Sequence, residues 1–286
     1  MNLSVYVASA FSKNHTGGNK AGVVLNQPTL TTPQKMAIAK QLGYAETVFI
    51  SASEVADYKL AYFTPKEEVD LCGHATIGAF AILKHLNQLG RQRYTVETNS
   101  GVLPITLQDD LIFMAQNQPT LHEVLSPNVL SACFDSQAID LQYPIQIVST
   151  GLKDILIPIK SDAQLHALQP NFEHIKTISQ QYNAIGMHLY AFDGDRIICR
   201  NFAPLYDIDE EAATGTANAA LASYLYQQHH LYKDLYVFEQ GYALRSPSEI
   251  LVRLSTNDQN DIEQVYVGGQ GHYCETKGVD VKNLSV

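Results

Sequence analysis

The chain has 286 residues, of which 45% are hydrophobic and 17% are charged, and its formal net charge is −10 at pH 7. This length allows one large or two medium domains with a substantial core, and the composition is that of an ordinary folded protein. Because an acidic surface on average repels nucleic acid and anionic membranes, we expect neither as a partner, whereas a small anion can still bind where backbone N–H groups cluster.

Short β-like runs predict most of the regular structure. They are rich in Val, Ile, Tyr and Phe, and many end at Gly, Asn, Asp or Pro, which is typical of strands. The expected strands cover residues 3–11, 22–25, 47–50, 59–63, 94–97, 111–114, 145–148, 155–159, 188–192, 196–202, 235–238, 250–254 and 264–267. The first of them lacks the features of a signal peptide, and no apolar segment is long enough to cross a membrane. We therefore expect a cytoplasmic protein.

Two amphipathic helices are expected on the surface. The pair Thr32-Pro33 has the residue types of an N-cap and a first turn, and the helix that it begins stops before Gly43. A similar pattern over residues 171–182 predicts a second such helix in the other half of the chain. Each of the two is expected to bury one face against the core.

Two further helices, over residues 73–86 and 215–228, have a different character. For most of their length neither has a charged face, so each is expected to be surrounded by protein on nearly all sides. Their many Gly, Ala and Ser residues allow neighbouring backbone to come close. A helix buried inside a curved, mainly antiparallel sheet satisfies both features and predicts an α+β fold.

The surroundings of these two helices resemble each other and indicate an internal repeat. Phe63-Thr64-Pro65 comes shortly before Gly73, and Phe202-Ala203-Pro204 comes shortly before Gly215. A chance match of common residues is the alternative. Because the same strand–turn–helix context surrounds both motifs, we expect a duplication.

A duplication predicts two pseudo-symmetric lobes, each a curved, mainly antiparallel sheet or barrel around its central helix. The expected lobes comprise residues 1–117 and residues 118–274, and the segment of about 275–286 is expected to pack back on the first lobe. Two related lobes would place their helix starts across a shared cleft, which is a usual location for a small-molecule site.

Both helix starts have the features of an anion site. Gly73 and Gly215 stand where a helix N-terminus presents unpaired N–H groups and the positive end of its dipole, and glycine lets a ligand approach the backbone closely. Two such starts could hold a carboxylate and stabilise charge that develops on it. Tight packing at a strand–helix turn is the alternative interpretation of either start alone.

Candidate acids and bases lie near these starts in the sequence. Glu46 enters an otherwise apolar strand, either as a carboxylate in water or as a base in a closed cleft, where burial would raise its pKa from about 4.3 toward neutral pH. His74 could donate a proton, orient a substrate or be structural. Glu211 either acts on a substrate or complements the helix dipole, and Thr216 either donates a hydrogen bond or caps the helix.

A series of short motifs runs almost end to end along the chain. They are Gly18-Asn19-Lys20-Ala21-Gly22-Val23, Ala45-Glu46-Thr47-Val48-Phe49, Phe63-Thr64-Pro65-Lys66-Glu67-Glu68-Val69, Cys72-Gly73-His74-Ala75-Thr76, Ser149-Thr150-Gly151, Arg200-Asn201-Phe202-Ala203-Pro204, Ala213-Thr214-Gly215-Thr216-Ala217, Gln240-Gly241, Arg245 and Gly268-Gly269. Any one of them is weak, but in this order and spacing they form a specific signature. By this signature the chain resembles the PhzF (phenazine-biosynthesis) isomerase family, part of the diaminopimelate-epimerase fold group.

The resemblance implies a fold, a chemistry and a site. It implies two lobes, each a curved sheet closed around a helix, in a chain that forms a homodimer. The chemistry that it implies is cofactor-free relocation of a proton in a cyclic hydroxy-diene amino acid, in which the glutamate matched by Glu46 takes a proton from carbon and redelivers it. By the same resemblance, the other catalytic residues are His74 and Glu211, and the substrate-binding residues are Asn19, Gly73, Thr214, Gly215 and Thr216.

The chain departs from the family's pattern at several motif positions. The usual Ser before the glutamate is Ala45, and the usual Pro of Gly-Asn-Pro is Lys20. In the second lobe Glu211 replaces Asp and Thr216 replaces Ser, which moves a carboxylate outward by about one methylene and adds a methyl group. We therefore expect the reaction class of the family, on a small carboxylate-bearing substrate that resembles an amino or hydroxy acid, more than the phenazine substrate itself.

Two alternative functions stay open at this point. Racemases and epimerases of the same fold use two opposed thiols, but only Cys72 is present here, because the matching place is Thr214 and a hydroxyl is a poor reversible base. The other alternative is a small-ligand-binding homologue that has lost catalysis. Neither the histidines nor the cysteines, which we expect to be reduced, follow a metal-binding pattern, and no nucleotide fingerprint is present. We expect no metal and no cofactor.

Overall fold

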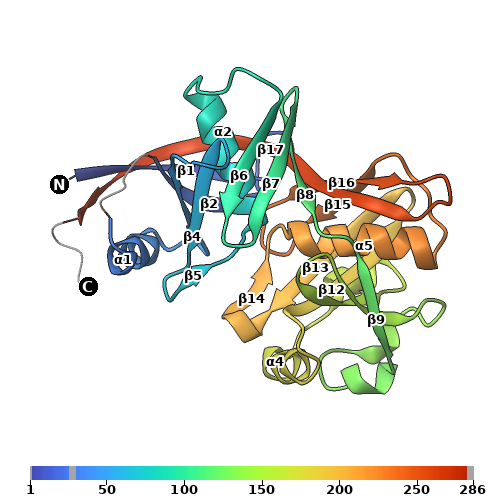
Figure 1. Ribbon diagram of the computed structural model, residues 1–286. Coiled ribbons are helices and arrows are strands. Elements are labelled where there is room, and N and C mark those ends of the chain that lie inside the picture. Colours follow the sequence, from blue (N-terminus) through green and yellow to red (C-terminus); the bar gives the residue numbers. More distant parts are fainter. Residues whose placement is uncertain (1, 26–29, 282–286) are drawn as a thin grey trace. The chain divides into compact units, whose positions relative to one another are not determined.

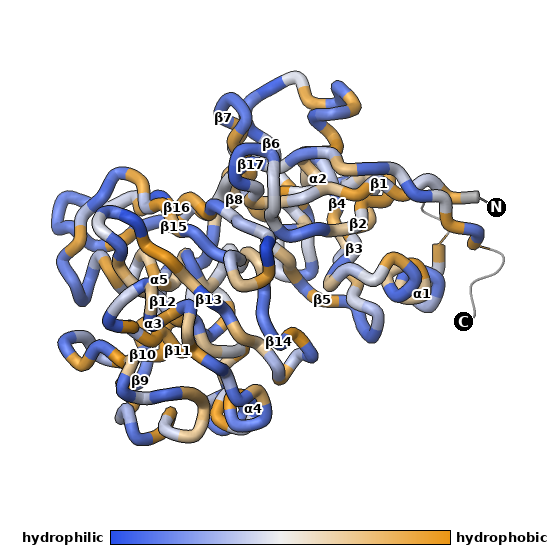
Figure 2. Tube along the Cα trace, turned by 180° about the vertical axis from the view of Figure 1, so that it is seen from behind, coloured by the Kyte–Doolittle hydropathy of each residue, from blue (hydrophilic) through white to orange (hydrophobic). Residues whose placement is uncertain are grey.

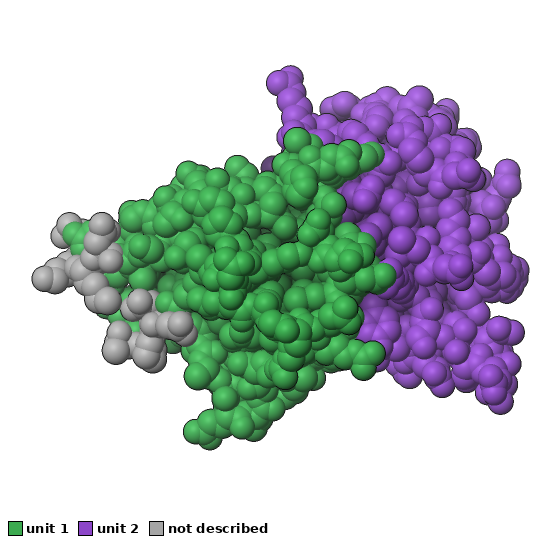
Figure 3. Space-filling view, turned by 90° about the horizontal axis from the view of Figure 1, so that it is seen from above, with its two compact units in different colours: residues 1–115, 268–286 green, residues 116–267 purple. Residues whose placement is uncertain are grey.

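The computed structural model describes residues 2–25 and 30–281. Its chain divides into two compact units, which Figure 3 draws in two colours. Unit 1 comprises residues 1–115 and 268–286, and unit 2 comprises residues 116–267. The chain returns to unit 1 at Gly268, before the position near residue 275 that the sequence suggested. The last residues of that expected segment, 282–286, lie outside the described part.

Unit 1 is a closed ring of strands around one helix (Figure 1). Its strands are β1 (Asn2–Ala10), β2 (Asn19–Leu25), β3 (Thr47–Ser51), β4 (Tyr58–Phe63), β5 (Glu68–Val69), β6 (Arg93–Thr98), β7 (Gly101–Gln108), β8 (Leu111–Gln116) and, from Gly268 onward, β17 (Ile262–Asp280), whose first residues belong to unit 2. The hydrogen-bonded order is β17–β1–β2–β3–β4–β6–β7–β8, and β8 also pairs with β17, which closes the ring. The pairs β2–β3 and β4–β6 are parallel, because a helix lies between their strands in the chain.

The helix α2 (Gly73–His85) is the core of unit 1. All residues from His74 to Leu83 are buried, and the helix packs against β1, β2 and β3 (Figure 1). A Cβ atom on Gly78 would lie 3.4 Å from the Cβ of Ala8, so a small residue here lets the strand approach the helix. The expectation that residues 73–86 form a helix surrounded by protein is confirmed.

The helix α1 (Thr32–Leu42) begins one residue earlier than the sequence suggested. Its N-cap is Thr31, whose side chain accepts a hydrogen bond from the backbone N–H of Gln34, so the expectation that Thr32 is the cap is wrong. The Gln34 side chain returns a bond to the backbone N–H of Thr31, and this capping box selects Thr31 over Thr32. The helix ends at Gly43 with a φ of 73°, as the sequence predicted.

Unit 2 repeats the plan of strands around a helix. Its elements are β9 (Thr120–Leu125), β10 (Ile145–Ser149), β11 (Lys153–Pro158), α3 (Asp162–Ala167), α4 (Phe172–Gln181), β12 (Gly186–Asp193), β13 (Arg196–Ala203), β14 (Ile208–Glu211), α5 (Gly215–Gln228), β15 (Tyr236–Gln240) and β16 (Ser248–Thr256), with single 3-10 turns at Pro127–Leu130, Ser136–Ala138 and Pro204–Tyr206. The helix α5 is buried from Ala217 to Leu225 and packs against β10, β11 and β16. In Figure 2 hydrophilic and hydrophobic residues alternate along the outer helices α1 and α4. Within the described ranges, no helix has both the length and the apolar character to cross a membrane.

The two units share one order of strand pairing. In unit 1 the antiparallel pair β1–β2 is followed by parallel β2–β3, antiparallel β3–β4 and parallel β4–β6 pairing. In unit 2 the pairs β10–β11, β11–β12, β12–β13 and β13–β15 have the same directions in the same order. The two units thus repeat one topology, as the internal repeat in the sequence predicted, and its origin by duplication stays a prediction.

Every expected strand overlaps an observed one, and the differences have local causes. The elements that the sequence did not predict are β5, β7, β9, β14 and α3. The strand β17 is 19 residues long although only residues 264–267 were expected, because Gly268 and Gly271 suggest an end. A Cβ on Gly268 would lie 2.4 Å from the carbonyl oxygen of Ile112, and one on Gly271 would lie 2.9 Å from the Cβ of Ala81. These glycines therefore permit close packing inside a strand.

Candidate functional site

Glu46 is the residue immediately before β3, and its backbone is fixed by β2. Its carbonyl oxygen accepts a hydrogen bond of 3.3 Å from the N–H of Gly22. A Cβ on Gly22 would lie 2.7 Å from Cδ1 of Leu42 and 2.8 Å from Oγ1 of Thr47, so only glycine lets β2 come this close to the start of β3. The carboxylate is thereby directed into the unit, and its side chain is only 15% exposed.

Cys72 and His74 are held by the first turn of α2. Cys72 is the N-cap, and its carbonyl oxygen accepts a hydrogen bond of 2.7 Å from the hydroxyl of Thr76. That hydroxyl is also 2.6 Å from the hydroxyl of Tyr62 on β4, and both side chains are buried. This chain of two hydrogen bonds ties the start of the helix to the wall of the ring.

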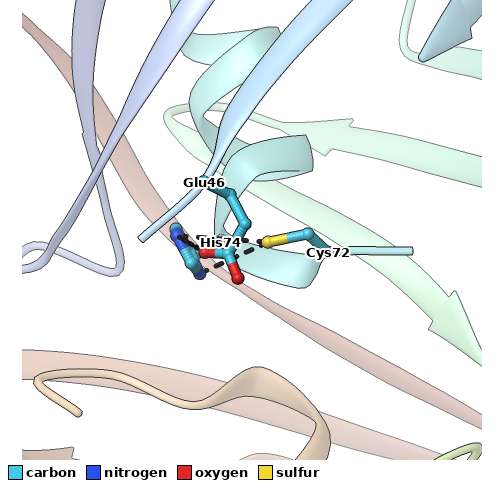
Figure 4. A group of neighbouring side chains, drawn as sticks. All are labelled: Glu46, Cys72 and His74. Carbon is cyan, nitrogen blue, oxygen red and sulfur yellow. Dashed lines mark hydrogen bonds and ion pairs between the residues drawn. The ribbon is translucent and has the colours of Figure 1, made fainter. Parts of the chain in front are cut away.

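The side chains of Glu46, Cys72 and His74 meet in one cluster (Figure 4). The Nε2 atom of His74 lies 3.1 Å from Oε2 of Glu46, and its Nδ1 atom lies 3.5 Å from Sγ of Cys72. The His74 side chain is 5% exposed. The structure therefore brings together the two residues expected in the first lobe, and it adds Cys72, which the sequence suggested only as a structural neighbour.

The charges of this cluster are mutually dependent. Burial is the largest influence on Glu46 and opposes its ionisation, but the charge of His74 and hydrogen bonds from His74 and Cys72 together prevail and lower the pKa of the carboxyl. Burial likewise opposes protonation of His74, yet Cys72 and Glu46 raise the pKa of the imidazole well above its ordinary value. At neutral pH the pair is thus a carboxylate beside an imidazolium.

Burial thus opposes ionisation of Glu46 as expected, but the net shift of its pKa is downward and not toward neutral pH. Desolvation acts as expected, but a cation in direct contact outweighs it. For Cys72, burial and the nearby charge of Glu46 raise the pKa of the thiol, so it stays protonated while Glu46 is ionised.

Little protein packs against Gly73, the first residue of α2. The Cys72 side chain makes no N-cap hydrogen bond, while the backbone N–H of Ala75 in the same turn is directed at its thiol. Within 4 Å a Cβ on Gly73 would meet only Cε of Met114, at 3.7 Å, which is an ordinary van der Waals contact. Asn19 begins β2 opposite Ala10, and it also belongs to unit 1.

In unit 2, Glu211 is held at the start of α5. Its Oε2 atom accepts a hydrogen bond of 2.5 Å from the hydroxyl of Thr214, the N-cap of the helix. Gln240 on β15 donates to the carbonyl oxygen of Glu211 at 2.8 Å and to the Thr214 hydroxyl at 3.1 Å. Thr214, Gly215 and Thr216 thus form the helix start that the sequence predicted.

A buried polar network supports this start from behind. The Asn218 amide donates to the carbonyl oxygen of Thr214 at 2.8 Å and to Oε1 of Gln240 at 2.9 Å, while its oxygen lies 3.2 Å from Nε2 of His188. The amide nitrogen of Asn201 lies 3.2 Å from Nδ1 of His188. Burial lowers the pKa of His188 to about 4, so the ring is neutral and can accept at Nδ1 and donate at Nε2.

Asp154 on β11 lies beside this network. It is 1% exposed, and burial together with the charge of Glu211 raises the pKa of its carboxyl to about 8. Glu210, in contrast, is bound by Arg200, whose guanidinium donates two hydrogen bonds of 2.9 and 2.8 Å to the carboxylate. The two adjacent glutamates therefore have different partners, and Glu210 anchors β14 to β13.

The sequence named the two helix starts and their charged residues but not the groups that support them. The supporting residues that it did not single out are Asp154, His188 and Asn218, and Asn201 and Gln240 appeared only as parts of motifs. One signal was available: Asn218 is an amide in an otherwise apolar stretch of helix. The pairing of His188 with Asn201 depends on strand register, which the sequence does not reveal.

Comparisons with known proteins agree with this fold and these motifs. The sequence profile of the PhzC–PhzF family, described as phenazine biosynthesis-like protein, matches residues 8–277. An uncharacterized isomerase from Clostridium acetobutylicum is 33% identical over 279 residues, which cover 91% of this chain and 92% of that protein.

Solved structures extend the likeness to three dimensions. A phenazine biosynthesis protein of the PhzF family from Bacillus anthracis matches with a TM-score of 0.89 at 26% identity, covering 98% of this chain and 99% of that one. A hydroxyproline epimerase from Agrobacterium vitis, solved with bound trans-4-hydroxy-L-proline, has the same fold, with a TM-score of 0.67 at 11% identity over 97% of this chain and 92% of that one. The expected two-lobed α+β fold is confirmed.

Proposed function

The chain belongs to the PhzC–PhzF family of phenazine biosynthesis-like proteins, and we propose that it is an isomerase that relocates a proton on a small substrate bearing a carboxylate. The observation that carries the proposal is the buried contact of 3.1 Å between Glu46 and His74 at the start of α2. A buried carboxylate held ionised by its neighbours, beside the N-terminus of a helix, is equipped to remove a proton from carbon.

In the proposed reaction Glu46 takes a proton from one carbon of the substrate and returns it to another. The electron pair of the broken C–H bond moves into the substrate, and a double bond shifts when the proton is returned, so no oxidant or reductant is needed. His74 compensates the charge of Glu46 and gives a hydrogen bond to it or to the substrate. The N–H groups at Gly73 receive negative charge that develops on the substrate.

The same proposal assigns roles to the residues of unit 2 and to Asn19. Glu211 polarises the substrate, with its carboxylate oriented by Thr214. Asn19, Gly215 and Thr216 bind the substrate. The substrate is proposed to resemble an amino or hydroxy acid, the reaction to need no cofactor, and the expected homodimer and cytoplasmic location stay predictions.

A racemase or epimerase of this fold is the alternative within the same chemistry. Such an enzyme needs a second acid or base on the opposite face of the carbon. Cys72 is a poor candidate, because burial and Glu46 hold the pKa of its thiol above the ordinary value. The hydroxyl of Thr214 already donates a hydrogen bond to Glu211, which favours a role for Thr214 in orienting that carboxylate.

Deuterium wash-in tests the proposal. A panel of amino and hydroxy acids, saturated and unsaturated, is incubated with the protein in D₂O and followed by NMR and mass spectrometry. We expect label at carbon together with a shifted double bond for at least one unsaturated acid, at a rate that a chelator does not lower. Label confined to the α-carbon of saturated acids would favour the epimerase, and no exchange across the panel would contradict both.

A further inference from the structure

The cluster of Glu46, Cys72 and His74 has a property that the proposed isomerase reaction does not use. Its three side chains supply a carboxylate, a thiol and an imidazole, the three ligand types that zinc takes in proteins. Their ligand atoms all lie within 4.8 Å of one another. Figure 4 draws the three side chains, with dashed lines for the hydrogen bonds and ion pairs between them. Among the described residues, these three form the group of His, Cys, Asp or Glu side chains whose ligand atoms lie close enough together to hold a metal ion.

The distances lie within about half an ångström of those in a tetrahedral site. Zn²⁺ binds sulfur at about 2.3 Å and nitrogen or oxygen at about 2.0–2.2 Å, which places neighbouring ligand atoms roughly 3.3–3.6 Å apart. Nε2 of His74 lies 3.1 Å from Oε2 of Glu46 and 4.0 Å from Sγ of Cys72. Small rotations of the Cys72 and His74 side chains, on the order of half an ångström at the ligand atoms, suffice to close the set.

The backbone that carries the ligands is already in place. Cys72 and His74 stand on the first turn of α2, which the hydroxyl of Thr76 fixes by its hydrogen bond to the Cys72 carbonyl. Glu46 is fixed by the hydrogen bond between its carbonyl oxygen and Gly22. Little ordering is therefore left for a metal ion to impose, and three protein ligands leave a fourth position for water or a substrate carboxylate.

We infer that this cluster is a binding site for a single Zn²⁺ ion, which binds as the Cys72 thiol and the His74 imidazolium each release one proton to solvent. The mixed set of sulfur, nitrogen and oxygen favours zinc over Mg²⁺ or Ca²⁺, which take oxygen ligands. An ion bound there occupies the carboxylate of Glu46, so that it cannot accept a proton from carbon. Zinc is thus a reversible inhibitor of any reaction for which Glu46 is the base.

The binding experiment uses the metal alone, so it does not depend on a substrate. The purified full chain, freed of metal, is titrated with Zn²⁺ against a chromophoric chelator, and separately with Co²⁺ to detect the thiolate-to-cobalt charge-transfer absorption. We expect one ion per chain and a charge-transfer band. Cys72→Ser should abolish the band and weaken Zn²⁺ binding by about 100-fold, the loss of one strong ligand.

Cys274→Ser is the matched control. Cys274 is a second part-buried thiol of unit 1, and its Sγ lies 3.7 Å from Nε2 of His272, so it forms a thiol–imidazole pair outside the cluster. This variant should bind Zn²⁺ and Co²⁺ as the parent does. Should Cys72→Ser fail to fold, as judged by circular dichroism, the band in the parent and in Cys274→Ser still decides the matter.

A parent without a charge-transfer band, or a band lost in Cys274→Ser and kept in Cys72→Ser, would overturn the inference. Its failure is separable from failure of the proposed isomerase. A chain that exchanges deuterium but binds no zinc at Cys72 contradicts the metal site alone. A chain that binds zinc but exchanges no substrate contradicts the isomerase alone.

Discussion

At the scale of single residues, Glu46 and His74 derive their properties from each other. An isolated carboxyl group in this position would be pushed toward its neutral form by burial, and an isolated imidazole would lose its proton for the same reason. At 3.1 Å each supplies the charge that the other needs. Removal of one partner therefore changes the protonation of the other as well as its orientation.

His74→Asn tests this dependence. The amide cannot carry a positive charge, so Glu46 loses the cation that keeps it ionised, and we expect deuterium exchange to slow by about 100-fold or more. The measurement is the exchange rate at saturating substrate. His272→Asn, which removes another part-buried histidine of unit 1, is the control and should stay within a few-fold of the parent. Equal rates for parent and His74→Asn would exclude a role for the pair.

Asp154 gives a prediction about stability and pH. Because the pKa of its carboxyl is about 8 in the folded chain and ordinarily 3.8, the folded state binds more protons between these values, and stability falls as pH rises through them. The slope is at most about 1.4 kcal/mol per pH unit. His188, with a folded pKa of about 4, acts in the opposite sense but only below about pH 6.5.

Asp154→Asn should remove this slope between pH 6.5 and 8. Relative to the parent, the variant should gain about 2 kcal/mol in free energy of unfolding on going from pH 6.5 to pH 8, as measured by urea denaturation. Asp110→Asn is the control, since contact with Lys84 lowers the pKa of that exposed carboxyl and its titration lies far below this range. Parallel pH profiles for parent and Asp154→Asn would contradict the raised pKa.

At the scale of elements, the two buried helices begin in the same way. In each helix, a side chain three positions after the first glycine donates a hydrogen bond to the carbonyl oxygen of the N-cap residue. Thr76 donates to Cys72 in α2, and Asn218 donates to Thr214 in α5. Neither N-cap side chain caps its helix. A side chain from within each helix thus fixes the turn from the core side.

Thr76→Val tests whether this bond positions the site. Valine keeps the shape but removes the hydroxyl that joins Cys72 to Tyr62, so we expect a loss of about 1–3 kcal/mol in unfolding free energy and a fall in kcat. Thr98→Val is the matched control, because the hydroxyl of Thr98 bonds to the carbonyl oxygen of Gly101 at a strand turn of the same unit. The control should lose stability without losing kcat. Equal kcat in both variants would show that the bond is structural only.

The sequence predicted these elements well where a signal is local. Helix α5 begins and ends at the predicted residues because an uncharged stretch with a glycine start is a strong pattern. The prediction was wrong in two places. The start of α1 depends on which threonine forms the cap bond, and the continuation of β17 through Gly268 depends on which atoms approach that glycine. The first choice is local, because the Thr31 and Gln34 side chains of the capping box stand three residues apart, whereas the choice at Gly268 is made by tertiary contacts.

At the scale of the whole molecule, one topology carries two different helix starts. The start in unit 1 has a charged pair and a thiol, Glu46, His74 and Cys72. The start in unit 2 has amides and a hydroxyl around Glu211, with a neutral His188 behind them. The two units therefore share a topology but differ in the chemistry of their helix starts.

Motif order predicted the fold and the positions of Glu46, His74 and Glu211, because these residues stand next to strand and helix boundaries. It did not predict the sign of the pKa shift of Glu46 or the roles of Asp154 and Asn218. The sign depends on a distance of 3.1 Å, and the network depends on the register that places His188 opposite Asn201. The distance and the register are both set only when the strands pair.

The central claim, that Glu46 is the base, is tested most directly by the deuterium exchange rate of Glu46→Gln on a substrate found by wash-in. The amide keeps the shape of the side chain but cannot accept the proton, so we expect the rate to fall by about 10³–10⁴-fold. Glu97→Gln, which changes a carboxylate of unit 1 bound to Lys59, should leave the rate unchanged. Exchange by Glu46→Gln within a few-fold of the parent would contradict the account.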